Sequence, residues 1–426
     1  MLMSKKKELI PKLRFPEFVD EGEWEEKKLG KIAKYENGKA HEQNIVKQGN
    51  YIAVNSKFIS TDGKVKKYTN TANCLASKGE ILMVLSDLPN GKALAKCFYV
   101  DINNNYSVNQ RICKITPINA ENKILYYLLN RNSYFLSFDD GVKQTNLRNE
   151  DVLKCPIILP KIQKEQQKIA SCLSSLDEMI AAQGQKLDLL KDHKKGLMQK
   201  LFPQEGEKVP KYRFKEFEKD GEWVEKKIIE TTDKKIKWSF TGGPFGSNLK
   251  ASDYTTEGIR IIQLQNIGDG EFNNEYKIYT SKEKADKLLS CNIYSDEIIL
   301  SKMGDPVGRA CIIPSYLNRC VMASDGIRLV VDEKKYSKYF IYSIINSKQI
   351  REAIEKKSTG STRKRIGLDE LKGIELMIPK TIKEQQKIAS CLSSLDALIT
   401  AQTEKIEQLK LHKKGLMQGL FPKIND

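Results

Sequence analysis

The chain has 426 residues, of which 40% are hydrophobic and 30% charged, so it is long enough for two or three domains with ordinary globular cores. Its apolar runs fall short of the ~18 residues that cross a membrane. The lysines near its start precede no apolar signal-peptide stretch, so we expect a cytoplasmic protein without membrane contacts. The net charge of +17 suits a polyanion such as DNA or RNA, although a basic protein from an organism with lysine-rich proteins carries the same charge.

Two segments of the chain occur twice. "PKLRFPEF" at 11–18, followed by "EWEEKK", returns as "PKYRFKEF" at 210–217, followed by "EWVEKK". Residues 161–203 match residues 380–422 at 31 of 43 positions. The chain therefore consists of two units, about 11–203 and 210–422, which the polar linker "QEGEKV" joins. A period this long exceeds that of solenoid repeats and indicates a duplicated domain.

The repeats predict a division of the chain into six parts. In chain order they are an N-terminal framework segment at 1–23, a first variable domain at 24–160, a central spacer helix at 161–203, a linker and framework segment at 204–222, a second variable domain at 223–379 and a C-terminal spacer helix at 380–426.

The two variable domains share an outline but little sequence. Each contains a β-like run after an acidic turn, "KGEILMVLS" at 78–86 and "SDEIILSKM" at 295–303. A strand with a polar front follows, "NQRICKIT" at 109–116 and "SDGIRLVV" at 324–331, and then an aromatic-rich helix pattern. The period-two alternation with Gly and Asn turns predicts mostly β structure with a few helices, and therefore an α+β protein.

Each spacer segment carries a heptad pattern, because apolar residues recur at alternating steps of four and three. The seam positions of the first are Ile169, Leu173, Leu176, Ile180, Gln183, Leu187, Leu190, Lys194, Leu197 and Leu201, and those of the second begin Ile388, Leu392, Leu395, Ile399 and Gln402. We predict that the two helices pair as an antiparallel coiled coil, which brings Gln183 close to Gln402. A coiled coil between two copies of the chain is the alternative.

Motifs of catalysis are missing from the sequence. There is no Walker A loop, no GxGxxG, no HExxH and no Asn/Asp-Pro-Pro-aromatic loop of an adenine methyltransferase. Of the three histidines, His193 and His412 occupy the same repeat position on a predicted helix, and the nine cysteines include no CxxC pair. We therefore assign no catalytic, cofactor-binding or metal-binding residue to this chain and predict no intrinsic catalysis.

Polar and basic loops of the variable domains are the candidate DNA contacts. Arg can read a guanine edge and Asn or Gln an adenine edge, while Lys and Arg neutralise phosphates, although any one of these residues fits a solvated loop equally well. The candidates are Asn109, Gln110, Arg111, Lys143, Gln144, Asn146 and Arg148 in the first domain, and Gln263, Gln265, Asn266, Lys356, Lys357, Arg363, Lys364 and Arg365 in the second.

These features together resemble the specificity subunit of type I restriction–modification systems. The similarity rests on "LRFPEF…GEWEEKKLG", "GEILMVLS", "DEIILSKMGDPVGRACII", "LKCPIILPKIQKEQQKIASCLSSLD" with its repeat, and "KKGLMQKLFP", and it covers essentially the whole chain. It implies that each variable domain is a target-recognition domain for one half of a bipartite, asymmetric site in double-stranded DNA. The helices would set the spacer and dock two modification subunits.

The resemblance also assigns the chemistry to partner subunits. Two modification subunits would use S-adenosylmethionine to methylate adenine, and restriction subunits would use ATP and Mg²⁺ to translocate and cleave DNA. Two other functions stay open from the sequence: a scaffold that binds only protein, and a nuclease or methyltransferase that acts alone.

Overall fold

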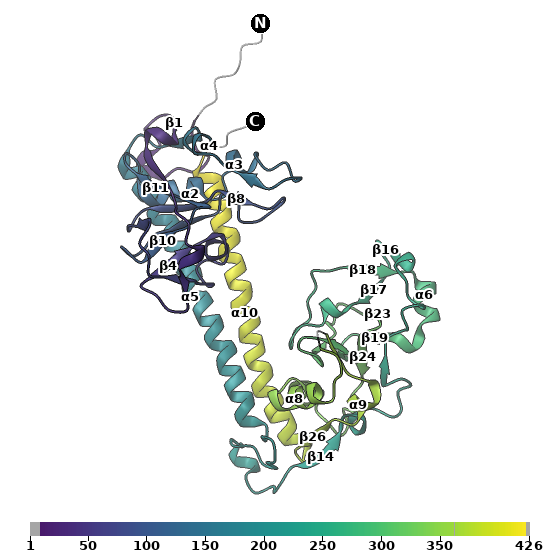
Figure 1. Cartoon of the computed structure of the whole chain (residues 1–426). Coiled ribbons are helices and arrows are strands. Elements are labelled where there is room, and N and C mark those ends of the chain that lie inside the picture. Colours follow the sequence, from purple (N-terminus) through teal and green to yellow (C-terminus); the bar gives the residue numbers. More distant parts are fainter. Residues whose placement is uncertain (1–8, 362, 423–426) are drawn as a thin grey trace. The chain divides into compact units, whose positions relative to one another are not determined.

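The computed structural model describes residues 9–361 and 363–422. The chain forms two compact units, one that runs to Gly184 and resumes at Lys405, and another at Gln185–Glu404. Each unit contains one variable domain and one end of each long helix (Figure 1). We call residues 24–160 domain 1 and residues 223–379 domain 2. Among the described residues, no helix is both long enough and apolar enough to cross a membrane.

Domain 1 contains a five-stranded sheet in the order β3-β5-β4-β10-β6 and a four-stranded sheet in the order β2-β11-β7-β9. Its strands are β1 (Glu25–Lys28), β2 (Ala33–Asn37), β3 (Ile45–Val46), β4 (Tyr51–Val54), β5 (Tyr68–Thr69), β6 (Leu75–Ala76), β7 (Ile81–Val84), β8 (Ser86–Asp87), β9 (Cys97–Tyr99), β10 (Tyr106–Val108), β11 (Ile112–Pro117), β12 (Thr145–Asn146) and β13 (Pro156–Leu159). Its helices are α1 (Ser56–Ser60), α2 (Asn122–Leu129), α3 (Ser133–Leu136) and α4 (Asn149–Leu153).

Domain 2 repeats this topology, with sheets in the orders β16-β18-β17-β23-β19 and β15-β24-β20-β22. Its strands are β14 (Val224–Lys227), β15 (Phe240–Gly242), β16 (Tyr254–Thr255), β17 (Ile259–Ile262), β18 (Ile278–Thr280), β19 (Asn292–Tyr294), β20 (Ile298–Ser301), β21 (Met303–Gly304), β22 (Ala310–Ile312), β23 (Arg319–Met322), β24 (Gly326–Leu329), β25 (Lys364–Arg365) and β26 (Glu375–Ile378). Its helices are α6 (Lys282–Lys287), α7 (Lys338–Ile345), α8 (Lys348–Lys356) and α9 (Leu368–Lys372).

One central strand of each domain lies between two hydrophobic cores. In β7, Ile81 and Met83 belong to one core while Leu82 belongs to the other. In β20, Ile298 faces one core and Ile299 the other. Alternate side chains of a strand point to opposite faces of its sheet, so the continuous apolar runs "ILMV" and "IIL" are what a strand covered on both faces requires.

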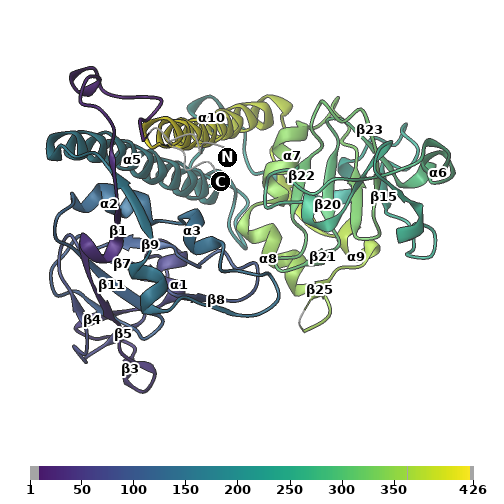
Figure 2. The same cartoon turned by 90° about the horizontal axis from the view of Figure 1, so that it is seen from above.

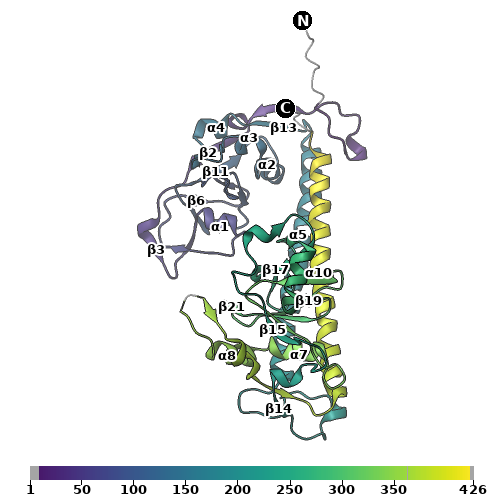
Figure 3. The ribbon, with the colours of Figure 1, turned by 90° about the vertical axis from the view of Figure 1, so that its right-hand side faces the viewer.

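The two long helices are α5 (Gln163–Leu201) and α10 (Ile382–Leu420), and their ends lie side by side in antiparallel directions (Figures 1 and 3). In the first unit, Lys413 near the end of α10 donates to Asp177 near the start of α5, at 2.5 Å. In the second unit, Lys194 near the end of α5 donates to Asp396 near the start of α10, at 2.5 Å. Each lysine is one of two polar residues in its heptad seam, the other being Gln183 in α5 and Gln402 in α10. Each lysine has a carboxylate of the partner helix.

A tyrosine of each domain completes these pairs. Tyr127 of α2 donates to the second oxygen of Asp177 at 2.7 Å, and Tyr339 of α7 donates to Asp396. Burial, and after it the hydrogen bond to Asp177, raises the pKa of Tyr127 above its ordinary range, so the phenol stays a donor. Each domain is thereby tied to both helices in its unit.

A buried ion pair attaches each framework segment to the start of a long helix. The Arg14 guanidinium makes two hydrogen bonds of 2.8 Å to Glu165, which is 1% exposed and also accepts from the Trp24 indole at 3.2 Å. Arg213 repeats the pair of 2.8 Å bonds to Glu384, which accepts from the Trp223 indole at 3.2 Å. The repeated letters "RF" and "EW" of the framework therefore have one physical role in both copies.

The fold prediction is confirmed: the chain is α+β, and its two helices pair within one chain as an antiparallel coiled coil. All the predicted seam positions named above are buried or half-buried. The close approach of Gln183 to Gln402 stays a prediction, as do the six domain boundaries. The predicted framework segment and terminal helix also include residues 1–8 and 423–426, which lie outside the described residues.

Candidate nucleic-acid interface

The carboxyl ends of two parallel strands organise one edge of domain 1. β4 and β10 pair in parallel, so the loops that follow them begin side by side, and Asn109 N–H donates to the Val54 carbonyl at 3.0 Å. Leu85 N–H then donates to the Arg111 carbonyl at 3.0 Å, and Leu147 N–H donates to the Leu85 carbonyl at 2.8 Å. Four loops that are distant in sequence thus meet at one place, which we call edge 1: residues 55–57, 85–96, 109–111 and 141–148.

Domain 2 has the same hydrogen-bond chain. Ala323 N–H donates to the Ile262 carbonyl at 2.9 Å, beside the parallel pair of β17 and β23. Lys302 N–H donates to the Asp325 carbonyl at 2.6 Å, and Ile366 N–H donates to the Lys302 carbonyl at 3.0 Å. We call these loops edge 2: residues 263–266, 302–309, 323–325, 356–361 and 363–367. In Figure 2, β8 lies in the loop that extends from domain 1, and β21 lies beside β25 in domain 2.

A glycine permits the close packing of each edge. Gly38 N–H donates to the Ile112 carbonyl at 2.9 Å, and a Cβ at position 38 would lie 2.1 Å from the Asn109 carbonyl oxygen. In domain 2, Gly243 N–H donates to the Gly326 carbonyl at 2.8 Å, and its Cβ would lie 1.8 Å from the Ala323 oxygen. No side chain fits at either position without a shift of the loop.

The candidates of domain 1 gather on edge 1. Arg111, Lys143 and Arg148 are exposed, and none of them forms an ion pair with any residue that the structure describes. The Gln144 amide donates to Ser86 Oγ at 2.7 Å and to Asn146 Oδ1 at 3.3 Å, which orients both amides. The remaining candidates of this edge are Asn109, which is half-buried, and Gln110, which is exposed.

The candidates of domain 2 divide into groups with different surroundings. Arg365 pairs with Asp325 at 2.7 Å, Lys364 pairs with Glu355, and Lys356 pairs with Glu205 at 3.3 Å. Such exposed pairs contribute about 0–1 kcal/mol each, so a phosphate can compete for these cations.

The other candidates of edge 2 lie as follows: Arg363 and Gln265 are exposed, Lys357 donates to the Gly373 carbonyl at 3.4 Å, and Gln263 donates to the Tyr254 hydroxyl at 3.3 Å.

Asn266 does not fit the role predicted for it. Its side chain is fully buried, accepts from Gln263 N–H at 2.9 Å, and donates to the carbonyls of Asn273 and Tyr276 at 2.8 and 2.9 Å. A side chain whose hydrogen bonds are satisfied inside the protein offers nothing to a base. Asn266 positions the loop that carries Gln263 and Gln265.

Three residues near these edges were missed from the sequence. Lys57 and Lys67 lie beside Arg111 around a cavity in domain 1. Phe245, in a tight turn just after Gly243, is 84% exposed, and an exposed aromatic face can stack on a nucleobase. Lysine-rich segments are common in this chain, so only the fold distinguishes Lys57 and Lys67 from other surface lysines.

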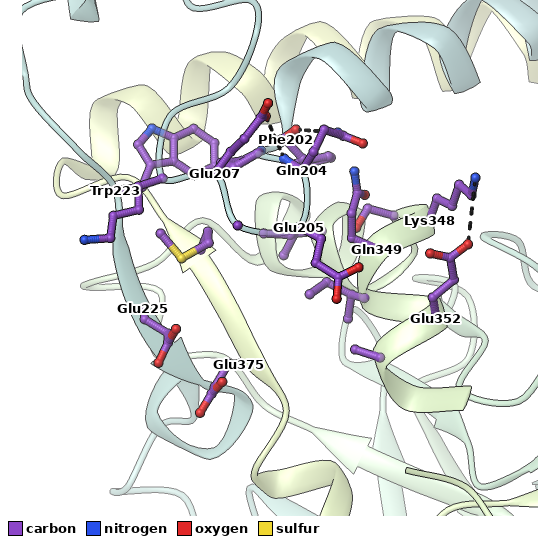
Figure 4. Close-up of a pocket in the computed structure, with 18 of the residues that line it drawn as sticks. Phe202, Gln204, Glu205, Glu207, Trp223, Glu225, Lys348, Gln349, Glu352 and Glu375 are labelled. Carbon is purple, nitrogen blue, oxygen red and sulfur yellow. Dashed lines mark hydrogen bonds and ion pairs between the residues drawn. The ribbon is translucent and has the colours of Figure 1, made fainter. Parts of the chain in front are cut away.

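A cavity larger than that of domain 1 lies in the second unit; it shares Lys356 with edge 2, but its charge does not suit DNA (Figure 4). It measures about 1020 Å³ and has an apolar floor that includes Phe202 and Trp223. Six glutamates and four lysines line it: Glu205, Glu207, Glu222, Glu225, Glu352, Glu375, Lys208, Lys348, Lys356 and Lys380. This excess of carboxylates repels a phosphate backbone.

Metal ligands and cysteine thiols are two kinds of reactive group to consider among the described residues. No group of three or more His, Cys, Asp or Glu residues there could hold a metal ion. Burial raises the pKa of the Cys74 thiol to about 11 and that of Cys155 to about 12, so both stay protonated and unreactive near neutral pH.

Comparison with known proteins gives consistent results. A family model described as "Type I restriction modification DNA specificity domain" matches residues 21–192 and 250–411. The type I restriction enzyme MjaVIII specificity subunit of Methanocaldococcus jannaschii is 23% identical over 424 residues, which cover 96% of this chain and 93% of that protein. The putative MjaX specificity subunit of the same organism is 29% identical over 310 residues, which cover 70% of this chain and 67% of the relative.

Solved structures agree with the fold. The S subunit of a type I restriction–modification system from M. genitalium superposes with a TM-score of 0.60 at 17% identity, covering 97% of this chain and 100% of that one. A chain from a structure concerned with complex assembly and conformational transition of the type I R-M system gives a TM-score of 0.53 at 16% identity, over 93% and 97% of the two chains. At these identities the similarity establishes the architecture.

Proposed function

The chain belongs to the type I restriction modification DNA specificity domain family, and from this premise we propose that it selects the DNA sequence for a type I restriction–modification complex. Domain 1 reads one half of a bipartite, asymmetric site in double-stranded DNA, and domain 2 reads the other half. The paired helices set the length of the non-specific spacer between the two halves.

The observation that carries this proposal is the conservation of backbone and divergence of side chains between edge 1 and edge 2. The same three backbone hydrogen bonds join the loops of each edge. The side chains at matched places differ, however, as with Arg111 in domain 1 and Asp325 in domain 2. Two copies of one scaffold with different recognition surfaces are suited to two different half-sites.

The chemistry belongs to partner proteins in this proposal. Two copies of a modification subunit dock on the helix pair, bind S-adenosylmethionine and methylate adenine, while ATP-dependent restriction subunits use Mg²⁺ and cleave. The repeated helix surface supports this stoichiometry, because 31 of 43 positions are identical and two like surfaces suit two copies of one partner. The chain itself then contributes recognition and assembly without catalysis.

Exchange of one domain tests the division of labour. Residues 24–160 are replaced by the first variable domain of a relative, and the chimera is expressed with its modification subunit in cells that lack other methylases. Single-molecule methylome sequencing should report a motif changed in one half-site only. A change in both halves, or in neither, would contradict the assignment of one half-site to each domain.

An insertion tests the spacer. Four residues added after Gln183 lengthen α5 by about 6 Å and nearly preserve its helical phase, because four residues approach one turn. Both half-site sequences should persist while the spacer grows by one or two base pairs. An active complex with the original spacer would show that the helices do not set the distance.

Methyl transfer by the purified chain alone would contradict the assignment of catalysis to partner subunits.

A further inference from the structure

A polar cavity of about 540 Å³ lies at the carboxyl ends of the parallel strands β4 and β10 of domain 1. It is lined by Ile45, Asn55, Ser56, Lys57, Lys67, Asn109 and Arg111. Three of these side chains are cations and none is an acid. Among the side chains that the structure describes, which do not include that of Glu42, no carboxylate forms an ion pair with Lys57, Lys67 or Arg111. The lining of the cavity therefore carries three positive charges and no acidic side chain.

The two asparagines of the cavity add hydrogen-bond donors. Asn55 Oδ1 accepts from Phe58 N–H at 2.9 Å, and Asn109 Oδ1 accepts from Gln110 N–H at 2.6 Å. Both asparagines thus use their oxygen within the protein, which leaves the amide nitrogen as the group for a ligand. A site made of ammonium, guanidinium and amide donors is complementary to an acceptor-rich anion.

The walls of this cavity are held by the scaffold. Ala53 N–H donates to the Lys67 carbonyl at 2.8 Å, and Leu85 N–H donates to the Arg111 carbonyl at 3.0 Å. The packing of Gly38 against Asn109 supports the loop from below. The backbones that carry the cations are therefore positioned before a ligand binds, which lowers the entropic cost of binding.

Domain 2 has no counterpart of this charge cluster. In the parallel pairs β4–β10 and β17–β23, Val54 of domain 1 and Ile262 of domain 2 occupy matching positions. Three residues after each of them, Lys57 in domain 1 corresponds to Gln265 in domain 2. β5 pairs antiparallel with β4 as β18 pairs with β17, and this register places Ile278 of domain 2 where domain 1 has Lys67. The carbonyls of Arg111 and Asp325 accept the matching hydrogen bonds, from Leu85 N–H and Lys302 N–H, so Asp325 stands where domain 1 has Arg111. Three cations in one domain are thus replaced by an amide, an alkyl group and a carboxylate in the other.

We propose that this cavity binds a backbone phosphate of the DNA half-site read by domain 1, with Lys57, Lys67 and Arg111 as its ligands. The inference rests on the proposed function and adds an asymmetry to it. At this position domain 1 holds its half-site by a salt-dependent interaction with phosphate, and domain 2 does not.

The test compares the salt dependence of binding. The full chain with its modification subunits is titrated onto a short duplex carrying the methylated motif, at several salt concentrations. The variant Lys57→Gln/Lys67→Ile/Arg111→Asp installs the residues of domain 2. The slope of log K against log salt is negative, and we expect its magnitude to decrease by about one for each phosphate that the variant no longer neutralises. The matched control Lys34→Gln/Lys78→Gln/Lys154→Asp lowers the net charge by four, as the variant does, at three exposed lysines that do not line the cavity, and it should change the slope less.

A second measurement identifies the ligand. Neutral methylphosphonate linkages are placed one at a time along the half-site of domain 1. At one position the neutral linkage should weaken binding of the wild-type complex. At the same position it should not weaken binding of the triple variant, which has already lost the contact with that phosphate. Arg111→Lys should retain the wild-type slope, because a phosphate accepts either cation, whereas a bidentate guanine contact requires Arg.

The outcomes separate this inference from the proposed function. Sequence-specific binding with an unchanged slope in the triple variant would overturn the phosphate site and leave DNA recognition intact. A sharp fall in affinity for Arg111→Lys, together with insensitivity to every methylphosphonate, would assign the cavity to a base edge. A wild-type complex that binds no DNA would instead contradict the proposed function. Circular dichroism and melting of each variant confirm that it is folded.

Discussion

Edge 1 and edge 2 share a backbone and differ in charge. Arg111 and Asp325 occupy the same place, since the carbonyl of each accepts from the loop that follows the central strand. In domain 1 the guanidinium has no ion-pair partner among the described residues, whereas in domain 2 the carboxylate pairs with Arg365 at 2.7 Å. Asn146 of domain 1 stands where domain 2 has Arg365.

The difference shows which residues are free to vary. Main-chain hydrogen bonds and the two glycines hold the loops in place whatever their side chains, so a charge reversal on the edge costs the fold little. By contrast, the framework pairs of Arg14 with Glu165 and Arg213 with Glu384 are nearly identical in geometry. Structure is repeated where the domains are anchored, and varied where they face outward.

The largest expected effect comes from removal of the framework ion pairs, which the two domains have in common. Arg14→Ala and Arg213→Ala each leave a glutamate that is 1% exposed without its counter-charge, and each should destabilise its own domain by about 3–5 kcal/mol. Chemical denaturation combined with hydrogen exchange resolved by domain measures both.

The surface pair of Lys154 with Glu150 provides the control for these variants, because Lys154→Ala should cost at most about 1 kcal/mol. A cost below that value for Arg14→Ala, or strongly unequal costs in the two domains, would show that the anchors are not equivalent.

The next largest effect comes from the two glycines that pack against the recognition loops, Gly38 at edge 1 and Gly243 at edge 2. Gly38→Ala and Gly243→Ala force a Cβ against the backbone oxygens of Asn109 and Ala323, and overpacking of this kind costs about 1–3 kcal/mol. We expect each variant to lose selectivity for one half-site in methylome sequencing and to keep it for the other. Gly246→Ala is the matched control, since nothing lies within 4 Å of its Cβ. Retained selectivity in both half-sites would mean that the loops do not depend on this packing.

A smaller change makes edge 2 more like edge 1. Asp325→Asn removes the carboxylate that pairs with Arg365, so the guanidinium becomes available to a phosphate. The slope of log K against log salt should steepen by about one if Arg365 then neutralises a phosphate. Glu150→Gln, which removes an exposed carboxylate from α4 of domain 1, controls for the change in net charge. An equal response of the two variants would indicate a general charge effect.

The smallest expected effect concerns the loop 141–148 of edge 1. Its turn is held by Asp140, whose Oδ1 accepts from Val142 N–H at 2.8 Å and from Lys143 N–H at 3.0 Å. These backbone donors hold the pKa of the Asp140 carboxyl below its ordinary value. A carboxyl with a depressed folded-state pKa contributes stability above its unfolded pKa and loses it as pH falls through the folded value.

Protection of the Val142 and Lys143 amides, measured as exchange relative to the intrinsic rate at each pH, should therefore fall below about pH 4, and in Asp140→Ala it should be low at neutral pH as well. Asp20→Ala, a surface carboxylate outside the loop, serves as the control. Protection at Val142 and Lys143 that stays constant across this pH range in the wild type would show that Asp140 does not hold the turn.

The sequence was most informative where residues repeat or alternate. The heptad steps of α5 and α10 indicated the helices and their pairing, because a stripe of period 3.5 needs a partner helix. The apolar runs of β7 and β20 indicated buried strands, since a strand between two cores has no polar face. The predicted DNA candidates were chosen from loop composition, and composition cannot tell an exposed amide such as Gln265 from a buried one such as Asn266.

What the sequence by itself determined was the duplication, the helix pair and the polar loops, all of which are local patterns. What only the tertiary structure decided was which loops meet. Lys57, Lys67 and Arg111 surround one cavity because β4 pairs in parallel with β10 and antiparallel with β5. Those pairings join segments far apart in the chain, and loop composition carries no record of them. The correspondence of Arg111 with Asp325 has the same origin, because hydrogen bonds between distant strands define it.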